Sequence, residues 1–303
     1  MQILGLIALL ASRAEAQSVV RQPDVIYGRK FGMALTMEVF TPPSRNGLGV
    51  LWVVSSSGRS SREQTLNDSF ARRIAPLLDR GYTVFAVLHG SAPVFNLQDQ
   101  VSDVRRAVRF VRHNAARFAV DSHRLGLSGS SAGGLLALIV ALDGRAGDLA
   151  TDDAVDGESS AVQAVGCFFA PTDLLNYGAD STTVVDIMRA RGSGIDPSFQ
   201  FYRIDTGGAR MPVTARDEVL GVLRELSPIS HVTPDDPPTI LIHGQEDLAV
   251  PAQQSRVLIE RLREVHVPAR LVLRPGAGHA YTGWEADAAL VADWFDEHLR
   301  RAR

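Results

Sequence analysis

The chain has only one cysteine, Cys167, among its 303 residues, so an internal disulfide is excluded. It also lacks an excess of charge, because 31 lysines and arginines face 34 aspartates and glutamates, for a formal net charge of −3. With no basic stripe or polybasic segment, nothing argues for binding to nucleic acid or to an anionic membrane surface. H-E-x-x-H, cysteine-pair, G-x-G-x-x-G and P-loop patterns are missing as well, and we expect no metal and no cofactor.

A short apolar run lies near the start of the chain, ILGLIALLA at 3–11, and an A-x-A pattern at 14–16 precedes Gln17. The run is too short to span a bilayer, whereas the apolar core of a signal peptide has this length. The sequence therefore predicts a signal peptide at 1–16, one domain at 17–303, and a secreted or periplasmic protein. Because no lysine or arginine precedes the run, a frayed apolar N-terminus is the alternative.

Apolar runs of strand length alternate with helical patterns from about residue 35. The expected strands are 34–40, 49–55, 82–88, 123–128, 161–169, 239–243 and 269–274, and the expected helices include 101–115, 135–142, 251–265 and 284–301. A further helix carries Leu66, Phe70, Ile74 and Leu77 behind a possible capping box of Ser60 and Glu63. Strands that are apolar throughout predict a mostly parallel sheet with helices on both faces.

One long segment, 174–232, breaks this alternation, and it comes after the expected strand at 161–169. It contains several glycines and the aromatic residues Tyr177, Phe199, Phe201 and Tyr202. Long irregular insertions in compact domains are usually functional, so we expect a cap over a binding site.

Three serines lie within four positions in GLSGSSAGGL, 126–135, directly between an expected strand and an expected helix. A nucleophilic serine at such a sharp turn needs glycine two positions before it and two after it, the G-x-S-x-G pattern. Only Ser131 satisfies this spacing, because Gly129 and Gly133 flank it, whereas Ser128 and Ser130 each lack a glycine.

Two later strands are each followed by a residue that could complete a nucleophilic site. Asp247 follows the strand at 239–243, and His279 lies in a glycine-bounded loop after the strand at 269–274. The chain order serine, aspartate, histidine is that of the α/β-hydrolases. Asp173 and Glu246 are alternative acids, and Asp103 fits a structural role near the start of its helix.

These motifs, DSHRLGLSGSSAGG, PTDLLNY, HGQEDLAVPAQQS and PGAGHAYTGW, resemble the α/β-hydrolase superfamily. The resemblance runs from about residue 25 to the end. It is greatest to secreted esterases and lipases of the feruloyl-esterase-like group, which have a prolyl-oligopeptidase-type core. It implies a serine ester hydrolase that acts on a small-molecule or polymer-linked ester, with Ser131 as nucleophile, His279 as base and Asp247 as its partner. A non-catalytic binding protein of the same fold and a small exopeptidase are the alternatives.

The chain departs from the family pattern where a His-Gly-Gly-Gly stretch would supply oxyanion donors. VVSSSGRSS at 53–61 stands there instead. We expect the donors to be the N–H groups of Ala132 and Ser57, with Ser56 beside them, and the serine side chains to favour small acyl groups. His89, Tyr177 and Trp284 are expected to line the site.

Overall fold

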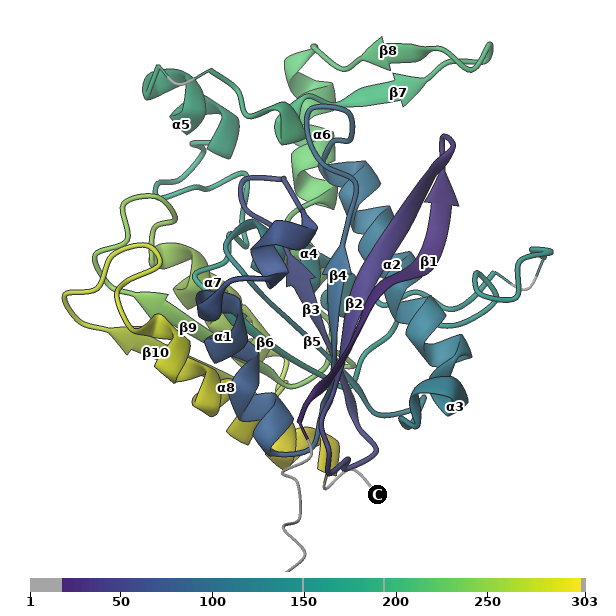
Figure 1. Ribbon diagram of the computed structural model, residues 1–303. Helices are drawn as coiled ribbons and strands as arrows, with labels where there is room; N and C mark the ends of the chain where they lie inside the picture. The colour runs from purple at the N-terminus through teal and green to yellow at the C-terminus, as the bar shows by residue number, and fades with distance from the viewer. Residues whose placement is uncertain (1–17, 149, 193, 301–303) are drawn as a thin grey trace, which may run out of the picture.

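Eight strands form one mostly parallel sheet (Figure 1). The computed structural model describes residues 18–148, 150–192 and 194–300. The strands, in chain order, are β1 (Val20–Lys30), β2 (Met33–Thr41), β3 (Gly49–Val54), β4 (Thr83–Leu88), β5 (Leu125–Ser130), β6 (Ala164–Phe168), β9 (Thr239–Gly244) and β10 (Ala269–Arg274). Their order across the sheet is β1-β2-β4-β3-β5-β6-β9-β10, and only β2 runs in the direction opposite to the other strands. The expected α/β fold and its seven strands are confirmed, within a few residues at each end.

Strand β1 was not expected from the sequence. It lies at the edge of the sheet and pairs with β2, and most of its side chains are exposed. One exception is Tyr27, which is buried and donates its hydroxyl to the carbonyl of Leu88 at 2.9 Å. An edge strand that alternates so weakly between apolar and polar residues gives little periodic signal.

Two apolar cores lie on opposite faces of the sheet. Helices α2 (Leu97–His113), α4 (Ala132–Leu142) and α7 (Gln253–Glu264) cover one face, and α1 (Asp68–Asp79) and α8 (Ala288–Phe295) cover the other. Alternate side chains of β3 enter the two cores, since Val53 packs in the first and Trp52 in the second. Because both faces are covered, only the two ends of the sheet are open for a site.

The start of α1 differs from the expected capping box. A 3₁₀ turn, η1 (Arg62–Thr65), comes first, and the Gln64 side chain accepts the Ser61 N–H at 2.9 Å. The helix then begins at Asn67, whose side-chain oxygen accepts the Phe70 N–H at 2.8 Å. The box of Ser60 and Glu63 was therefore wrong by one residue, because Asn67 caps the long helix and a separate short turn precedes it.

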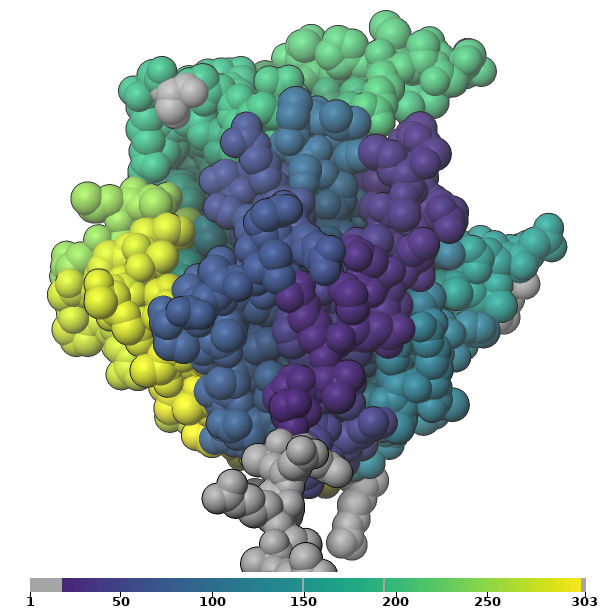
Figure 2. Space-filling view, in the orientation of Figure 1, coloured from purple at the N-terminus to yellow at the C-terminus, as the bar shows by residue number. Residues whose placement is uncertain are grey.

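The insertion 174–232 contains α5 (Val184–Ala190), a hairpin of β7 (Tyr202–Ile204) and β8 (Arg210–Pro212), and α6 (Arg216–Glu225). Figure 2 shows it in green across one end of the molecule. Two of its aromatic side chains, Tyr177 and Phe201, are buried in the core shared with α7, and Tyr202 donates a hydrogen bond to Asp99 of α2. These aromatics attach the insertion to the body of the domain.

Among the described residues, none of the helices has the length and apolar character needed to span a bilayer. The predicted signal peptide at 1–16 lies outside the described residues.

Candidate active site

Ser131 lies at a sharp turn between β5 and α4. Its φ is +52°, a conformation that costs a residue with a Cβ atom roughly 1–3 kcal/mol. Two backbone hydrogen bonds hold the turn: the Ser131 N–H donates to Phe168 O at 2.9 Å, and the Ser131 carbonyl accepts the Leu135 N–H at 3.0 Å. The backbone therefore holds the side chain of Ser131 at the carboxyl end of the sheet.

The flanking glycines are required by close backbone packing. A Cβ atom on Gly129 would lie 2.5 Å from Gly133 O, and one on Gly133 would lie 2.4 Å from Val53 O of the neighbouring strand. Real Cβ atoms essentially never approach backbone oxygens this closely. The structure thus gives the G-x-S-x-G spacing a steric reason, because only glycine lets helix α4 start against β3 and β5.

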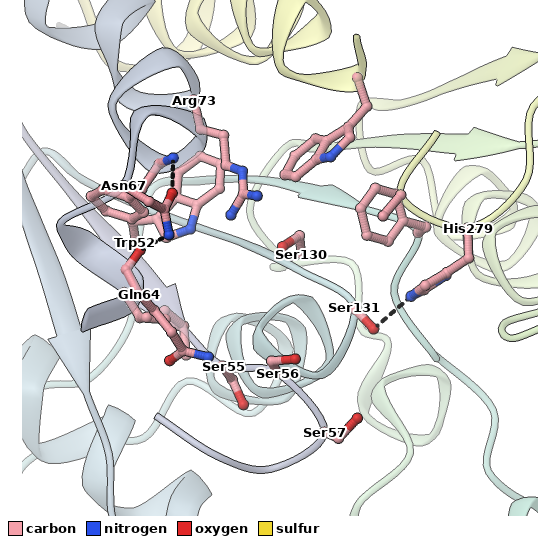
Figure 3. Close-up of a pocket in the computed structure, with 16 residues that line it drawn as sticks. Trp52, Ser55, Ser56, Ser57, Gln64, Asn67, Arg73, Ser130, Ser131 and His279 are labelled. Atoms are coloured by element: carbon pink, nitrogen blue, oxygen red, sulfur yellow. Dashed lines mark hydrogen bonds between the residues drawn. The ribbon is translucent and has the colours of Figure 1, made fainter. Parts of the chain in front are cut away.

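A chain of hydrogen bonds joins Ser131 to two residues that follow later strands. The distance from Ser131 Oγ to His279 Nε2 is 3.0 Å (Figure 3), and the distance from His279 Nδ1 to Asp247 Oδ2 is 2.7 Å. Asp247 follows β9 and His279 follows β10, while Ser131 follows β5. The structure brings together the three residues that the sequence singled out.

Asp247 is buried and held from several directions. Its Oδ1 accepts the N–H groups of Ala249 and Val250, both at 2.9 Å. Burial alone would raise the pKa of this carboxyl group, but hydrogen bonds with His243, His279 and the Val250 N–H hold it well below its usual range. The group is therefore a fixed negative charge beside the imidazole of His279.

Sequence reasoning missed the part that His243 plays. This fully buried side chain at the end of β9 places Nε2 2.9 Å from Val250 O and 3.3 Å from Asp247 Oδ2. Its Nδ1 lies 2.7 Å from Ser255 Oγ. A histidine four residues before the acid, at a strand end, was the available signal.

The alternative acids do not contact His279. Asp173 accepts the N–H groups of Leu175 and Asn176 within its own loop. Glu246 is exposed, and Asp103 pairs with Lys30 at 2.6 Å. Among these carboxylates, only Asp247 is placed to orient the imidazole.

A cavity of about 380 Å³ opens at Ser131. It is lined by Trp52, Val53, Val54, Ser55, Ser56, Ser57, Gln64, Asn67, Phe70, Arg73, Ser130, Ser131, Phe169, His279, Ala280 and Trp284. Trp284 is thus placed as expected.

Two residues that were expected to line the site, Tyr177 and His89, do not line this cavity. Tyr177 donates its hydroxyl to Ala249 O at 2.9 Å in the loop that contains Asp247, and His89 is buried next to the end of β4. The described residues of 174–232 also contribute nothing to this lining.

Two residues of the serine loop after β3 have left-handed conformations: Ser57, with a φ of +47°, and Gly58, with a φ of +67°. The Ser56 N–H donates to Arg59 O at 2.8 Å and is therefore already engaged. Of the expected oxyanion donors, this leaves the backbone N–H groups of two residues: Ser57, which lines the cavity, and Ala132, the first residue of α4.

The fold and this arrangement of residues place the chain in the α/β-hydrolase class, in its esterase and lipase group. More narrowly, it belongs to the BD-FAE family, whose model matches residues 37–262.

Curated relatives agree with this assignment, and a solved structure agrees with the fold. The chain is 27% identical over 270 residues to Esterase LipQ of Mycobacterium tuberculosis (strain ATCC 25618 / H37Rv), covering 89% of this chain and 55% of that protein. It is 26% identical over 211 residues to Esterase LipC of the same organism, covering 69% and 47%. The chain thus spans about half the length of these relatives. A truncated carbohydrate esterase from gut microbiota has the same fold, with a TM-score of 0.72 and 23% identity over 95% of this chain and 99% of that one.

The burial of His89 predicts a pH-dependent stability. Burial lowers the pKa of this imidazole to about 4, whereas histidine in an unfolded chain titrates near ~6.5. Between these values the unfolded state binds a proton that the folded state does not, so stability should fall as the pH drops from ~6.5 to ~4. His89→Gln should reduce the slope of the unfolding free energy in this window by up to ~1.4 kcal/mol per pH unit.

Urea unfolding at several pH values measures this slope. His123→Gln is the matched control, because His123 is exposed and its removal should leave the slope unchanged. Equal slopes for the His89 variant and the wild type would contradict the burial argument.

Proposed function

We propose that the chain is a serine hydrolase of carboxylic esters. The observation that carries the proposal is the hydrogen-bonded series of Ser131, His279 and Asp247 at the mouth of a cavity. Membership of the BD-FAE family and the esterase names of the relatives support it.

The reaction follows from the residue types. Ser131 Oγ attacks the ester carbonyl carbon while His279 Nε2 takes the hydroxyl proton. The proton then passes to the oxygen of the leaving alcohol, and the acyl group stays bonded to Ser131. His279 next takes a proton from water, whose oxygen attacks the acyl carbon. The bond between Ser131 Oγ and the acyl carbon then breaks, His279 returns the proton to Oγ, and the acid is released. Asp247 keeps the imidazole in one tautomer and stabilises its protonated form.

Removal of the nucleophile tests this mechanism. Ser131→Ala should lower kcat on short-chain p-nitrophenyl esters by ~10⁴-fold or more, because among the described residues Ser131 has the only hydroxyl that hydrogen-bonds to His279. Ser128→Ala is the control, since Ser128 Oγ donates to Gly166 O between two strands at 2.7 Å. A Ser131→Ala variant with most of its activity would contradict the assignment, and faster cleavage of an aminoacyl anilide than of any ester would favour a peptidase.

The oxyanion donors are assigned to the backbone of Ser57 and Ala132. Because an N–H group remains whatever the side chain is, Ser57→Ala and Ser56→Ala should each change kcat by less than ~10-fold. A hydroxyl donor would instead cost ~10²–10³-fold when deleted. We expect the Cβ atom of Ser57 to narrow the part of the cavity that holds the acyl group of the substrate. Acetyl esters should therefore be cleaved better than long-chain esters. Steady-state kinetics on an acyl-length series measures both effects, and a hundredfold loss in either variant would assign the oxyanion to a side chain.

We also propose that the protein is exported. The apolar run at 3–11 and the A-x-A pattern at 14–16 support cleavage before Gln17. Expression in a bacterial host should give a periplasmic or secreted protein whose intact mass is that of the chain starting at Gln17. A cytoplasmic product that retains Met1 would contradict export.

A further inference from the structure

Arg73 extends from α1 into the cavity that contains Ser131. In Figure 3 its guanidinium points toward the middle of the cavity. The guanidinium carbon lies 4.3 Å from the centroid of the Trp284 ring. Arg73 Nη2 also donates a hydrogen bond to Ser69 Oγ, one turn earlier in α1, at 2.7 Å, which fixes the position of the side chain.

The charge of Arg73 has no partner inside the cavity. Among the lining residues that the structure describes, none is an aspartate or a glutamate, and Arg73 is the only arginine or lysine. Glu285 is the nearest compensating group, but its Oε1 accepts the Ser69 hydroxyl at 2.7 Å and lies 3.7 Å from Arg72. Glu285 is therefore already engaged by Ser69 and Arg72 outside the cavity, and the inside of the cavity remains positive.

The donors of the cavity are also unequally engaged. The two amide side chains already donate to nearby backbone carbonyls: Gln64 Nε2 donates to Arg59 O at 3.5 Å, and Asn67 Nδ2 donates to Gln64 O at 3.2 Å. In contrast, Arg73 Nε is buried and has no hydrogen-bond partner among the described residues. A buried donor without a partner costs ~1–3 kcal/mol, and more when it is charged.

Burial, together with the nearby charge of Arg72, lowers the pKa of the Arg73 guanidinium, and Glu285 opposes them only in part. An anion in the cavity would offset the cost of burying this positive charge. The aromatic wall would strengthen the pairing, because indole rings exclude water and lower the local dielectric. Trp52 and Trp284 supply that wall, on β3 and after β10 respectively.

We propose that this cavity binds esters that carry a carboxylate group, with the carboxylate paired to Arg73 while the ester carbonyl lies at Ser131. The inference rests on the proposed esterase function and adds the charge of the substrate to it. The proposal covers a carboxylate on the acyl half or on the alcohol half of the ester, since both halves adjoin the attacked carbon. A neutral ester of the same shape would leave Arg73 without a partner.

Matched substrate pairs test the proposal. 4-Acetoxybenzoate and 4-acetoxybenzamide differ only in charge on the alcohol half, and monoethyl glutarate and ethyl glutaramate differ only on the acyl half. The wild-type enzyme should prefer the carboxylate member of at least one pair by ~10-fold or more in kcat/KM. Arg73→Gln should abolish this preference, and Arg73→Lys should restore part of it, because lysine keeps the charge without the planar donors.

The neighbouring arginine gives a matched control. Arg72 has the same charge and also lies near Glu285, but it is mostly exposed and does not line the cavity. Arg72→Gln should therefore keep the preference. Equal rates within both pairs in the wild type, or an equal loss of preference in the Arg72 and Arg73 variants, would overturn the proposal.

Binding separates this proposal from the esterase proposal itself. Calorimetry with the Ser131→Ala variant should show that the preferred carboxylate ester binds at least ~10-fold more tightly than its amide partner. If neutral esters are hydrolysed in a Ser131-dependent way but no charge preference is found, only the anion proposal fails. If no ester is hydrolysed but the binding preference is present, the esterase proposal fails and the anion site stands. Should Arg73→Gln not fold, the wild-type preference and the Arg73→Lys variant decide the outcome.

Discussion

The left-handed turn at Ser131 is the constraint on which the rest of the site depends. A serine at a φ of +52° is held there only because the surrounding backbone fixes it on both sides. Gly133 lets the first turn of α4 approach Val53 O of β3, and the Ser131 N–H bonds to Phe168 O of β6. The strands on both sides of β5 therefore hold the turn, and the parallel sheet order places these same strand ends together.

The acid end of the site is held in a different way. Asp247 lies in a loop rather than at a strained turn, and its position depends on hydrogen bonds from the residues around it. His243 contacts it from the end of β9, and Tyr177 of the insertion donates to Ala249 O in the same loop. The insertion thus supports the loop that carries the acid, although its described residues do not line the cavity. A segment can in this way affect a site without touching the substrate.

The sequence predicted the structure best in short segments whose side chains are fully buried. The strands of the parallel sheet are apolar on both faces, so their runs stand out, and the spacing of Gly129 and Gly133 identified Ser131 among three serines. Strand β1 was missed because it is an edge strand with mostly exposed residues. The contacts of Tyr177 and His243 depend on loops that meet only in the folded chain, and no periodic pattern reports such long-range pairs.

Arg73 shows why the charge of the cavity was harder to predict from the sequence than the residues of the hydrogen-bonded series. The helical spacing of Phe70, Ile74 and Leu77 identified the buried face of α1, and Arg73 lies on the border of that face. Whether such a border residue points to solvent or into a site depends on what packs against the helix. Here Trp284 does so, since its ring lies against Arg73 on one side and 5.1 Å from the Phe169 ring on the other. The Phe169 ring in turn lies 4.8 Å from that of His279. A continuous series of side-chain contacts, with the aromatic rings packed edge to face, therefore fixes both the cation of the cavity and the imidazole beside Ser131. The position of charge recognition and the position of proton transfer are thus set together.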